Sequence, residues 1–494
     1  MRHHLKRLLK GSVIYGLGSV ATQALSLLIL PLFTAYLSPE DYGINAVLSL
    51  MNALLVAVLS LGLGVSIGLV YYEPSQGQDH QGQVIWNSLL ALLPGCVLLL
   101  LAAVWAPAWI SRLLLHSPAH AGLVSLMLIA TVLNLVSLPL GLHLQFQERS
   151  KYYVGVTLAY SFFTLAMSVL LIVGFRLGLY GRVLAYALGS LLNVLLLLRS
   201  AARSLCFRFD REMVHTLLRH GLPTIPSFFS IFVFQQGNVY ILKELSSLRE
   251  VGLYSVGMTF GSAASLAVNA FTTAWIPFAL SFRDKPEEAR HLFGRIMSYY
   301  LLSVGSLSLL FYLFAKLMVA MFTQPDFHAA SRVIGLGSSV QLLLGVVTIL
   351  NIESYQAKEI KYLVLCQMLA ALGFVPLSIL LTSRFDSVGA AAALVTGYGL
   401  LGLLLAYLNR RRRHKYLNIV YEKGRLLRFG LAYLLIAGTS LASGPEFAWW
   451  QVGLSALLLL VYGVYVYRML LSPAERSYVE AQLRALRLRL NPGR

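Results

Sequence analysis

Long runs of apolar residues recur along almost the whole chain, separated by Pro, Gly or charged residues. A helix needs about 20 apolar residues to cross the hydrocarbon core of a bilayer. The runs are continuous and do not alternate in ten-residue segments, which excludes a transmembrane barrel. We therefore expect an all-α polytopic membrane protein with about fourteen crossing helices, at 11–37, 42–70, 84–110, 120–145, 153–175, 177–198, 221–246, 251–281, 292–322, 328–356, 362–383, 386–409, 429–443 and 447–467.

The composition supports this interpretation and excludes a soluble globular enzyme. Only 12% of the 494 residues are charged, against about 25% in soluble domains. No connection between the predicted helices is long enough for a folded catalytic domain. The three cysteines lie far apart without ligand spacing, and no nucleophile or phosphate-loop motif has a suitable context. We therefore predict no metal, no cofactor and no catalytic residue.

The net charge of +19 is explained by membrane topology. Lys and Arg accumulate in loops that remain in the cytoplasm, and most of those in this chain fall on one side when the N-terminus is placed inside. Both termini are therefore predicted to be cytoplasmic, and the basic residues attract anionic membrane lipids rather than nucleic acid. The basic, amphipathic tail at 471–494 fits the inner leaflet, and it could also dock a partner such as a glycan polymerase or assembly enzyme.

Part of the chain is repeated at an offset of 209 residues. Ser-Pro-Glu-Asp-Tyr-Gly-Ile-Asn-Ala-Val at 38–47 is echoed by Ser-Leu-Arg-Glu-Val-Gly-Leu-Tyr-Ser-Val at 247–256. The same offset aligns 146–149 with 355–358, and a slip of one residue aligns Gly181 and Gly189 with Gly389 and Gly397. Each unit holds six predicted helices, so the two copies have the same orientation in the membrane. Such parallel repeats are typical of carriers that expose a central cavity to alternate sides.

The repeat divides the chain into six predicted parts. These are an N-terminal six-helix lobe at 1–200, a basic cytoplasmic linker at 201–220, a second six-helix lobe at 221–409, a basic loop at 410–428, two additional crossing helices at 429–470 and the tail at 471–494.

Four motifs carry a resemblance to a known family over about residues 5–410. They are Phe-Thr-Ala-Tyr-Leu-Ser-Pro-Glu-Asp-Tyr-Gly at 33–43, Phe-Gln-Glu-Arg at 146–149, Gly-Leu-Pro-Thr-Ile-Pro at 221–226 and Val-Gly-Leu-Tyr-Ser-Val at 251–256. With these motifs the chain resembles the oligosaccharide and polysaccharide flippases, of the O-antigen flippase type, in the multidrug/oligosaccharidyl-lipid/polysaccharide exporter superfamily. The resemblance implies two six-helix lobes in a V shape. It also implies transport of an undecaprenyl-pyrophosphate-linked glycan to the outer leaflet of a bacterial inner membrane.

Polar side chains inside the predicted spans are the candidates for a substrate cavity. An unpaired amide in hydrocarbon is costly, so such groups face the protein interior. They either bind sugar hydroxyls or hold helices together by hydrogen bonds, and the sequence leaves both roles open. The candidates are Gln23, Asn45, Asn52, Gln235, Gln236, Asn238, Asn269 and Trp275.

Charged residues at membrane depth are few. Arg182 could bind pyrophosphate, because a guanidinium suits bidentate contact, or it could extend to the outer interface. Arg149 and Lys358 are related by the repeat and lie at the predicted cytoplasmic ends of the helices. There they could bind the incoming pyrophosphate head group, or they could be ordinary basic residues that fix the orientation of the helices in the membrane. Glu353 is the candidate for proton or sodium coupling, provided that it is buried.

Two other functions remain open at this point. A multidrug or organic-cation antiporter would share the two-lobed architecture but needs a buried acidic residue in a lobe, and no Asp lies within a predicted span interior. A membrane glycan polymerase or ligase would need a substantial outer loop, and the outer connections are short. An entirely structural scaffold is disfavoured by the repeat.

Overall fold

The computed structural model describes residues 25–480, apart from 26, 28, 73–78, 148, 203, 283–284, 358, 413–416, 443, 445–446, 474 and 478–479. Every regular element in this described part is helical. The candidates Gln23 and Lys358 and most of the basic tail lie outside it.

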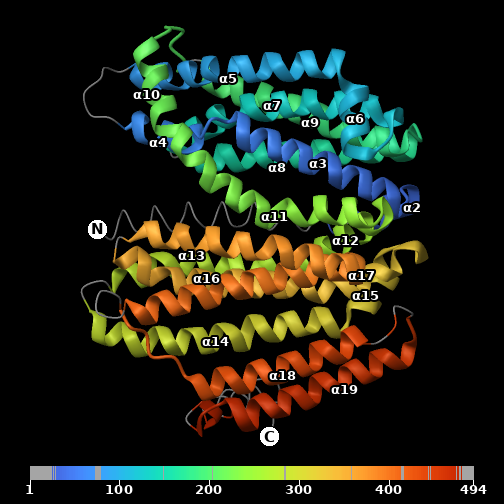
Figure 1. Cartoon of the computed structure of the whole chain (residues 1–494), viewed down its shortest axis with the longest axis vertical. Coiled ribbons are helices and arrows are strands. Elements are labelled where there is room, and N and C mark those ends of the chain that lie inside the picture. The colour runs from blue at the N-terminus through green and yellow to red at the C-terminus, as the bar shows by residue number, and fades with distance from the viewer. Residues whose placement is uncertain are drawn as a thin grey trace, which may run out of the picture.

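The helices form two stacked bundles, which are drawn in blue to green and in green to orange (Figure 1). The first bundle contains α2 (Leu30–Tyr36), α3 (Pro39–Leu59), α4 (Leu63–Tyr71), α5 (His80–Trp105), α6 (Pro107–Leu115), α7 (Ala121–Phe146), α8 (Ser150–Val169) and α9 (Gly178–Ala201). The short α10 (Arg211–Gly221) packs on α4 and α5 and leads into the second bundle. That bundle contains α11 (Ile225–Leu245), α12 (Leu248–Gly261), α13 (Ser265–Ser281), α14 (Pro286–Leu313), α15 (Ala315–Phe322), α16 (Ser331–Gln356) and α17 (Ile360–Arg411).

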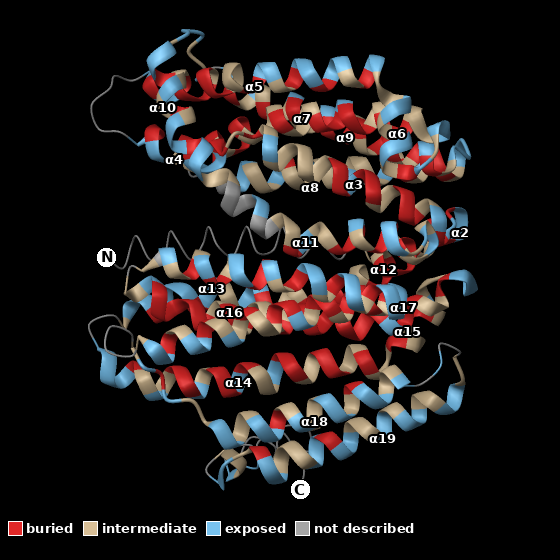
Figure 2. Cartoon of the chain, viewed as in Figure 1, coloured by how far each residue is buried: buried red, intermediate tan, exposed pale blue. Residues whose placement is uncertain are grey.

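Two further helices, α18 (Lys423–Ala442) and α19 (Trp449–Tyr465), cover one side of the second bundle. They pack against α14 and are largely exposed, whereas α16 is buried over most of its length (Figure 2). An exposed apolar surface on a helix of this length suits contact with lipid. The pair is therefore an addition to the outside of the second lobe.

Eleven helical stretches in the described residues are long and apolar enough to cross a membrane, compared with the fourteen that we expected. The first expected span falls largely outside the described residues, and the polar side chains of α11 lower its hydropathy. The expected spans 362–383 and 386–409 are counted together as α17, but they are two helices that meet at Asp386, where φ is 47° and the backbone is not helical. The chain is a multi-pass helical membrane protein.

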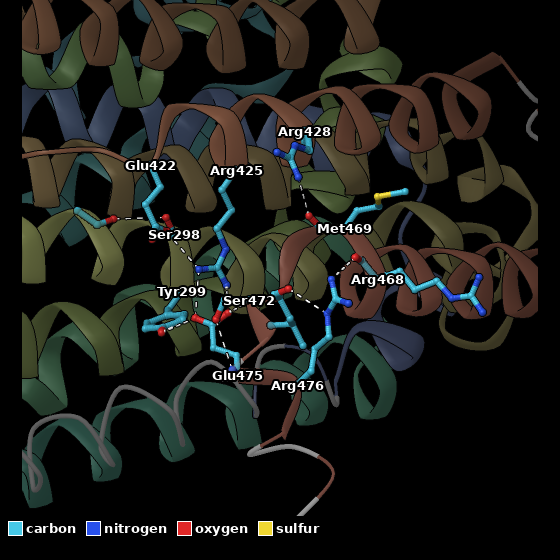
Figure 3. A network of polar contacts seen from close by, with 12 residues as sticks. Ser298, Tyr299, Glu422, Arg425, Arg428, Arg468, Met469, Ser472, Glu475 and Arg476 are labelled. Atoms are coloured by element: carbon cyan, nitrogen blue, oxygen red, sulfur yellow. Dashed lines mark hydrogen bonds and ion pairs between the residues drawn. The ribbon is translucent and has the colours of Figure 1, made fainter.

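The start of the tail is fixed to the second lobe by the carboxylate of Glu475 (Figure 3). Arg425 at the start of α18 lies 3.0 Å from this carboxylate, and the Tyr299 hydroxyl on α14 donates to it at 2.6 Å. The backbone N–H of Ser472 donates to it at 2.7 Å. Burial alone would raise the pKa of Glu475, but these donors outweigh burial and lower the pKa to about 2.

The two copies of the repeated motif begin α3 and α12 and lie against one another. Ser38 and Ser247 are the N-caps, since their hydroxyls accept the N–H of Asp41 at 3.1 Å and of Glu250 at 3.3 Å. One turn later, the backbones meet without space for a side chain. A Cβ atom on Gly43 would lie 1.8 Å from the carbonyl oxygen of Leu248, and one on Gly252 would lie 1.7 Å from that of Pro39. The helices α3 and α12 therefore join the two lobes near the N-terminal ends of both helices.

We predict that Gly43→Ala lowers the thermal stability of the purified protein in detergent, because the added methyl group forces the two helices apart. Overpacking of this kind costs about 1–3 kcal/mol. The matched control is Gly64→Ala on α4, where a Cβ atom would meet nothing within 4 Å. The control should be neutral or stabilising, since Ala is the better helix former. An equal effect of both substitutions on the melting temperature would contradict the close crossing.

Candidate functional site

A cavity with a volume of about 520 Å³ lies in the first lobe, on the side that meets the second lobe. Its walls come from α2, α3, α7, α8 and α9, and Thr259 and Ser262 contribute from the second lobe. Both lobes thus contribute to its lining, as expected for a site that changes access when lobes move. The first-lobe candidate Asn45 lines this cavity.

Arg182 is the only charged side chain among the described residues that line the cavity. Its guanidinium carbon lies 4.5 Å from the ring centroid of Phe33 and 6.0 Å from that of Tyr42. These aromatic faces attract the cation but do not neutralise it. The α9 helix therefore presents a positive charge to this cavity.

A network of amides and hydroxyls supports the wall behind this cavity. The amide oxygen of Asn52 accepts from the Thr131 hydroxyl at 2.9 Å and from the Asn134 amide at 3.3 Å. Asn134 also donates to the Tyr186 hydroxyl at 2.9 Å, and Ser190 donates to Asn134 at 3.4 Å. The candidate Asn52 thus joins α3 to α7 and α9, and it does not line the cavity itself.

A second cavity of about 330 Å³ lies between α7, α8 and α9. Tyr160 lines both cavities. The second cavity is also lined by two amide side chains, Gln145 and Asn193, and by three hydroxyl-bearing residues, Ser137, Tyr153 and Thr157. The sequence analysis did not identify these residues. The recurrence of hydroxyl side chains every three or four residues along 153–168 is the signal that could have found them.

The candidates in the second lobe are not brought together with Arg182, and none of them lines a described cavity. Asn238 is fully buried, donates to the carbonyl of Ala390 at 2.7 Å and accepts from the Ser378 hydroxyl at 2.7 Å. It therefore ties α11 to α17. Trp275 is buried among aromatic rings, and its ring centroid lies 4.9 Å from that of Phe293. The remaining three are exposed or half-buried on α11 and α13: Gln235, Gln236 and Asn269.

Glu353 is buried near the end of α16, where its carboxylate accepts the backbone N–H of Asn418 at 3.2 Å. Asn418 adopts a left-handed conformation with φ of 55°. The adjoining Val420 donates to the carbonyl of Arg290 on α14 at 3.1 Å, and its own carbonyl oxygen would lie 1.9 Å from a Cβ atom on Gly294. In this structure Glu353 holds the segment between α17 and α18 against the second lobe.

Of the two arginine candidates for pyrophosphate, only Arg182 lines a described cavity. Arg149 is exposed at the start of α8. Its position at a helix mouth suits an early contact with a head group, and it stays a candidate for that role.

Comparison with known proteins places this architecture in a family. The family described as "Polysaccharide biosynthesis protein" matches residues 8–282, which is more than half of the chain. The chain belongs to the polysaccharide biosynthesis protein family. The comparison with curated proteins found no match to this chain.

Solved structures share the fold of this polysaccharide biosynthesis protein at low sequence identity. The lipid II flippase MurJ, in an inward closed conformation, aligns with a TM-score of 0.65 and 13% identity, over 92% of this chain and 99% of that one. An inward-facing multidrug resistance MATE family transporter of the MOP superfamily aligns with a TM-score of 0.61 and 14% identity, over 79% and 94% of the two chains. The expected recognition and the two-lobed helical fold class are thereby confirmed.

We predict that Glu353→Gln destabilises the segment at 417–422 and leaves the pH dependence of transport unchanged. A glutamine amide keeps one acceptor oxygen but loses the negative charge and puts an NH2 donor in place of the second oxygen, so its hydrogen bond from the Asn418 N–H is weaker by about 1 kcal/mol. Limited proteolysis in the basic loop should become faster. Loss of pH-dependent transport with an unchanged proteolysis rate would instead support ion coupling through Glu353.

Proposed function

We propose that this protein is a flippase that moves a polyprenyl-pyrophosphate-linked oligosaccharide from the inner to the outer leaflet of the bacterial cytoplasmic membrane. It would serve the synthesis of a cell-surface polysaccharide by alternating access of the two lobes. The observation that carries this proposal is Arg182, the one charged side chain among the described residues that line the cavity of the first lobe.

The chemistry of Arg182 suits a pyrophosphate. A guanidinium offers a planar fork of N–H donors that matches two phosphate oxygens at once. The attraction is stronger for a half-buried guanidinium than for one on the protein surface, because the effective dielectric constant is lower. Because no described Asp or Glu lines the cavity, the positive charge is available to an anionic ligand.

The crossing of α3 and α12 supports alternating access. The lobes meet where Gly43 and Gly252 touch, and the distribution of Lys and Arg predicts that this end faces outward. In this proposal the crossing closes the outward side, and the substrate would enter the cavity from the cytoplasmic side. Rocking of the lobes would separate α3 from α12 and release the head group outward.

The cation-coupled multidrug antiporter is the alternative function. An organic cation needs a carboxylate partner, and the described lining of the main cavity supplies a cation instead. The family description, which concerns polysaccharide biosynthesis, also supports the flippase. A glycan polymerase or ligase is the least favoured alternative, and polymerases or assembly enzymes are proposed only as partners.

The test is to deplete the protein from cells and to measure polyprenyl-linked glycans by mass spectrometry, with an impermeant sugar-modifying enzyme reporting the leaflet. We expect one glycan to accumulate on the inner leaflet. Wild-type protein and the control variant Arg112→Ala, which changes an exposed arginine, should restore export.

Arg182→Ala should reduce export at least about ten-fold, because a hydrogen bond to a charged group contributes about 1.5–3 kcal/mol. Arg182→Lys should retain part of the activity, since it keeps the charge but loses the fork. Intact surface polysaccharide in depleted cells, or full export by Arg182→Ala at normal abundance, would contradict the proposal. Drug sensitivity without glycan accumulation would favour the antiporter.

A further inference from the structure

The two cavities of the first lobe are lined by the same face of α8, and we call the strip along this face the groove. The side chains that line it recur at helical spacing, three or four residues apart. Tyr160 lines both cavities, so it marks the place where one cavity gives way to the other. The complete set on this face is Tyr153, Val156, Thr157, Tyr160, Ser161, Thr164, Leu165 and Ser168.

The groove has a charged end and an uncharged end. With a rise of 1.5 Å per residue, the span from Tyr153 to Ser168 is about 22 Å long. Arg182 lies in the cavity at the Ser168 end, and Asn193, about three turns further along α9, lies in the cavity at the Tyr153 end. No charged side chain is among the described residues that line the cavity at the Tyr153 end.

The hydroxyls along α8 act mainly as acceptors toward the groove. Thr157 donates to the carbonyl of Tyr153 at 3.0 Å, Ser161 to that of Thr157 at 2.8 Å and Ser168 to that of Thr164 at 2.7 Å. These three hydroxyl hydrogens are therefore used within the helix, while the oxygen lone pairs remain. Of the three, Thr157 lines the cavity at the Tyr153 end, where its lone pairs can accept hydrogen bonds from a polyol and disfavour an anion.

The amides of Asn193 and Gln145 complete the uncharged end. Neither side chain makes a hydrogen bond to another residue in the described part of the chain. Asn193 is half-buried within a membrane-crossing helix, where an unpaired amide is costly unless water or a ligand satisfies it. An amide supplies both a donor and an acceptor, which is the combination that vicinal sugar hydroxyls require.

We infer that the cavity at the Tyr153 end binds the uncharged sugar that follows the pyrophosphate, and that Asn193 selects for it. This inference rests on the proposed function, because it places the pyrophosphate at Arg182. Tyr160 lies between the phosphate and sugar positions. Sugars with a carboxylate are excluded from this position, since no described residue there would neutralise them.

Binding of soluble substrate analogues to the purified full-length protein in detergent tests the inference. The probes are farnesyl pyrophosphate alone, farnesyl pyrophosphate linked to N-acetylglucosamine, and the same lipid linked to glucuronic acid. The variants are Asn193→Leu, which keeps the volume but removes the amide, and Phe162→Leu, a control on the exposed face of α8.

We expect the wild-type protein to bind the probe with N-acetylglucosamine more tightly than farnesyl pyrophosphate alone. Asn193→Leu should weaken binding of the N-acetylglucosamine probe about five- to ten-fold, as loss of one or two hydrogen bonds implies. Asn193→Leu should leave binding of farnesyl pyrophosphate unchanged, and Phe162→Leu should leave all three affinities unchanged. Glucuronic acid should add no affinity.

The outcomes separate this inference from the proposed function. If farnesyl pyrophosphate binds through Arg182 but N-acetylglucosamine adds nothing, or adds affinity that Asn193→Leu does not reduce, the sugar site is wrong and the flippase proposal stands. Equal gains from glucuronic acid and N-acetylglucosamine would also overturn the selectivity. If no probe binds the wild-type protein, the pyrophosphate site fails, and the sugar site fails with it.

Discussion

The contact between α3 and α12 determines how the two lobes meet. Gly43 and Gly252 occupy equivalent places in the two copies of the repeat, and neither leaves space for a Cβ atom. Backbone-to-backbone contact of this kind allows close approach without long side chains that would have to disentangle during movement. Since the first cavity receives residues from both lobes, the candidate site lies where the two lobes meet.

The polar residues of this chain fall into two groups, those that hydrogen-bond within the fold and those that face a cavity. Asn238 and Glu353 are buried and hydrogen-bonded within the second lobe, so their surroundings account for them. Asn52 is likewise satisfied within the first lobe. Arg182 and Asn193 differ, because they face cavities and the described residues offer no ion-pair partner to the first and no hydrogen bond to the second. A ligand or water can satisfy such groups, and an anionic group joined to an uncharged sugar suits both.

The sequence predicted the fold more fully than the site. Apolar runs and the repeat at 38–47 and 247–256 predicted a two-lobed helical membrane protein, because bilayer thickness and helix geometry leave few alternatives. Arg182 and Asn45 were also identified, since a cation or amide in a span is rare. The sequence could not separate Asn238 from Asn193, because helical periodicity does not tell whether a polar side chain faces a cavity or a neighbouring helix. The joint role of α8 depends on α7 and α9 as neighbours, which only the tertiary structure reveals.

Native mass spectrometry of the protein purified from its own membranes tests the central claim most directly. The account predicts a bound lipid whose mass is that of a polyprenyl pyrophosphate bearing a glycan. This adduct should be absent from Arg182→Ala and present in Arg112→Ala. Co-purification of ordinary phospholipids alone, with identical spectra for the wild-type and Arg182→Ala proteins, would contradict it.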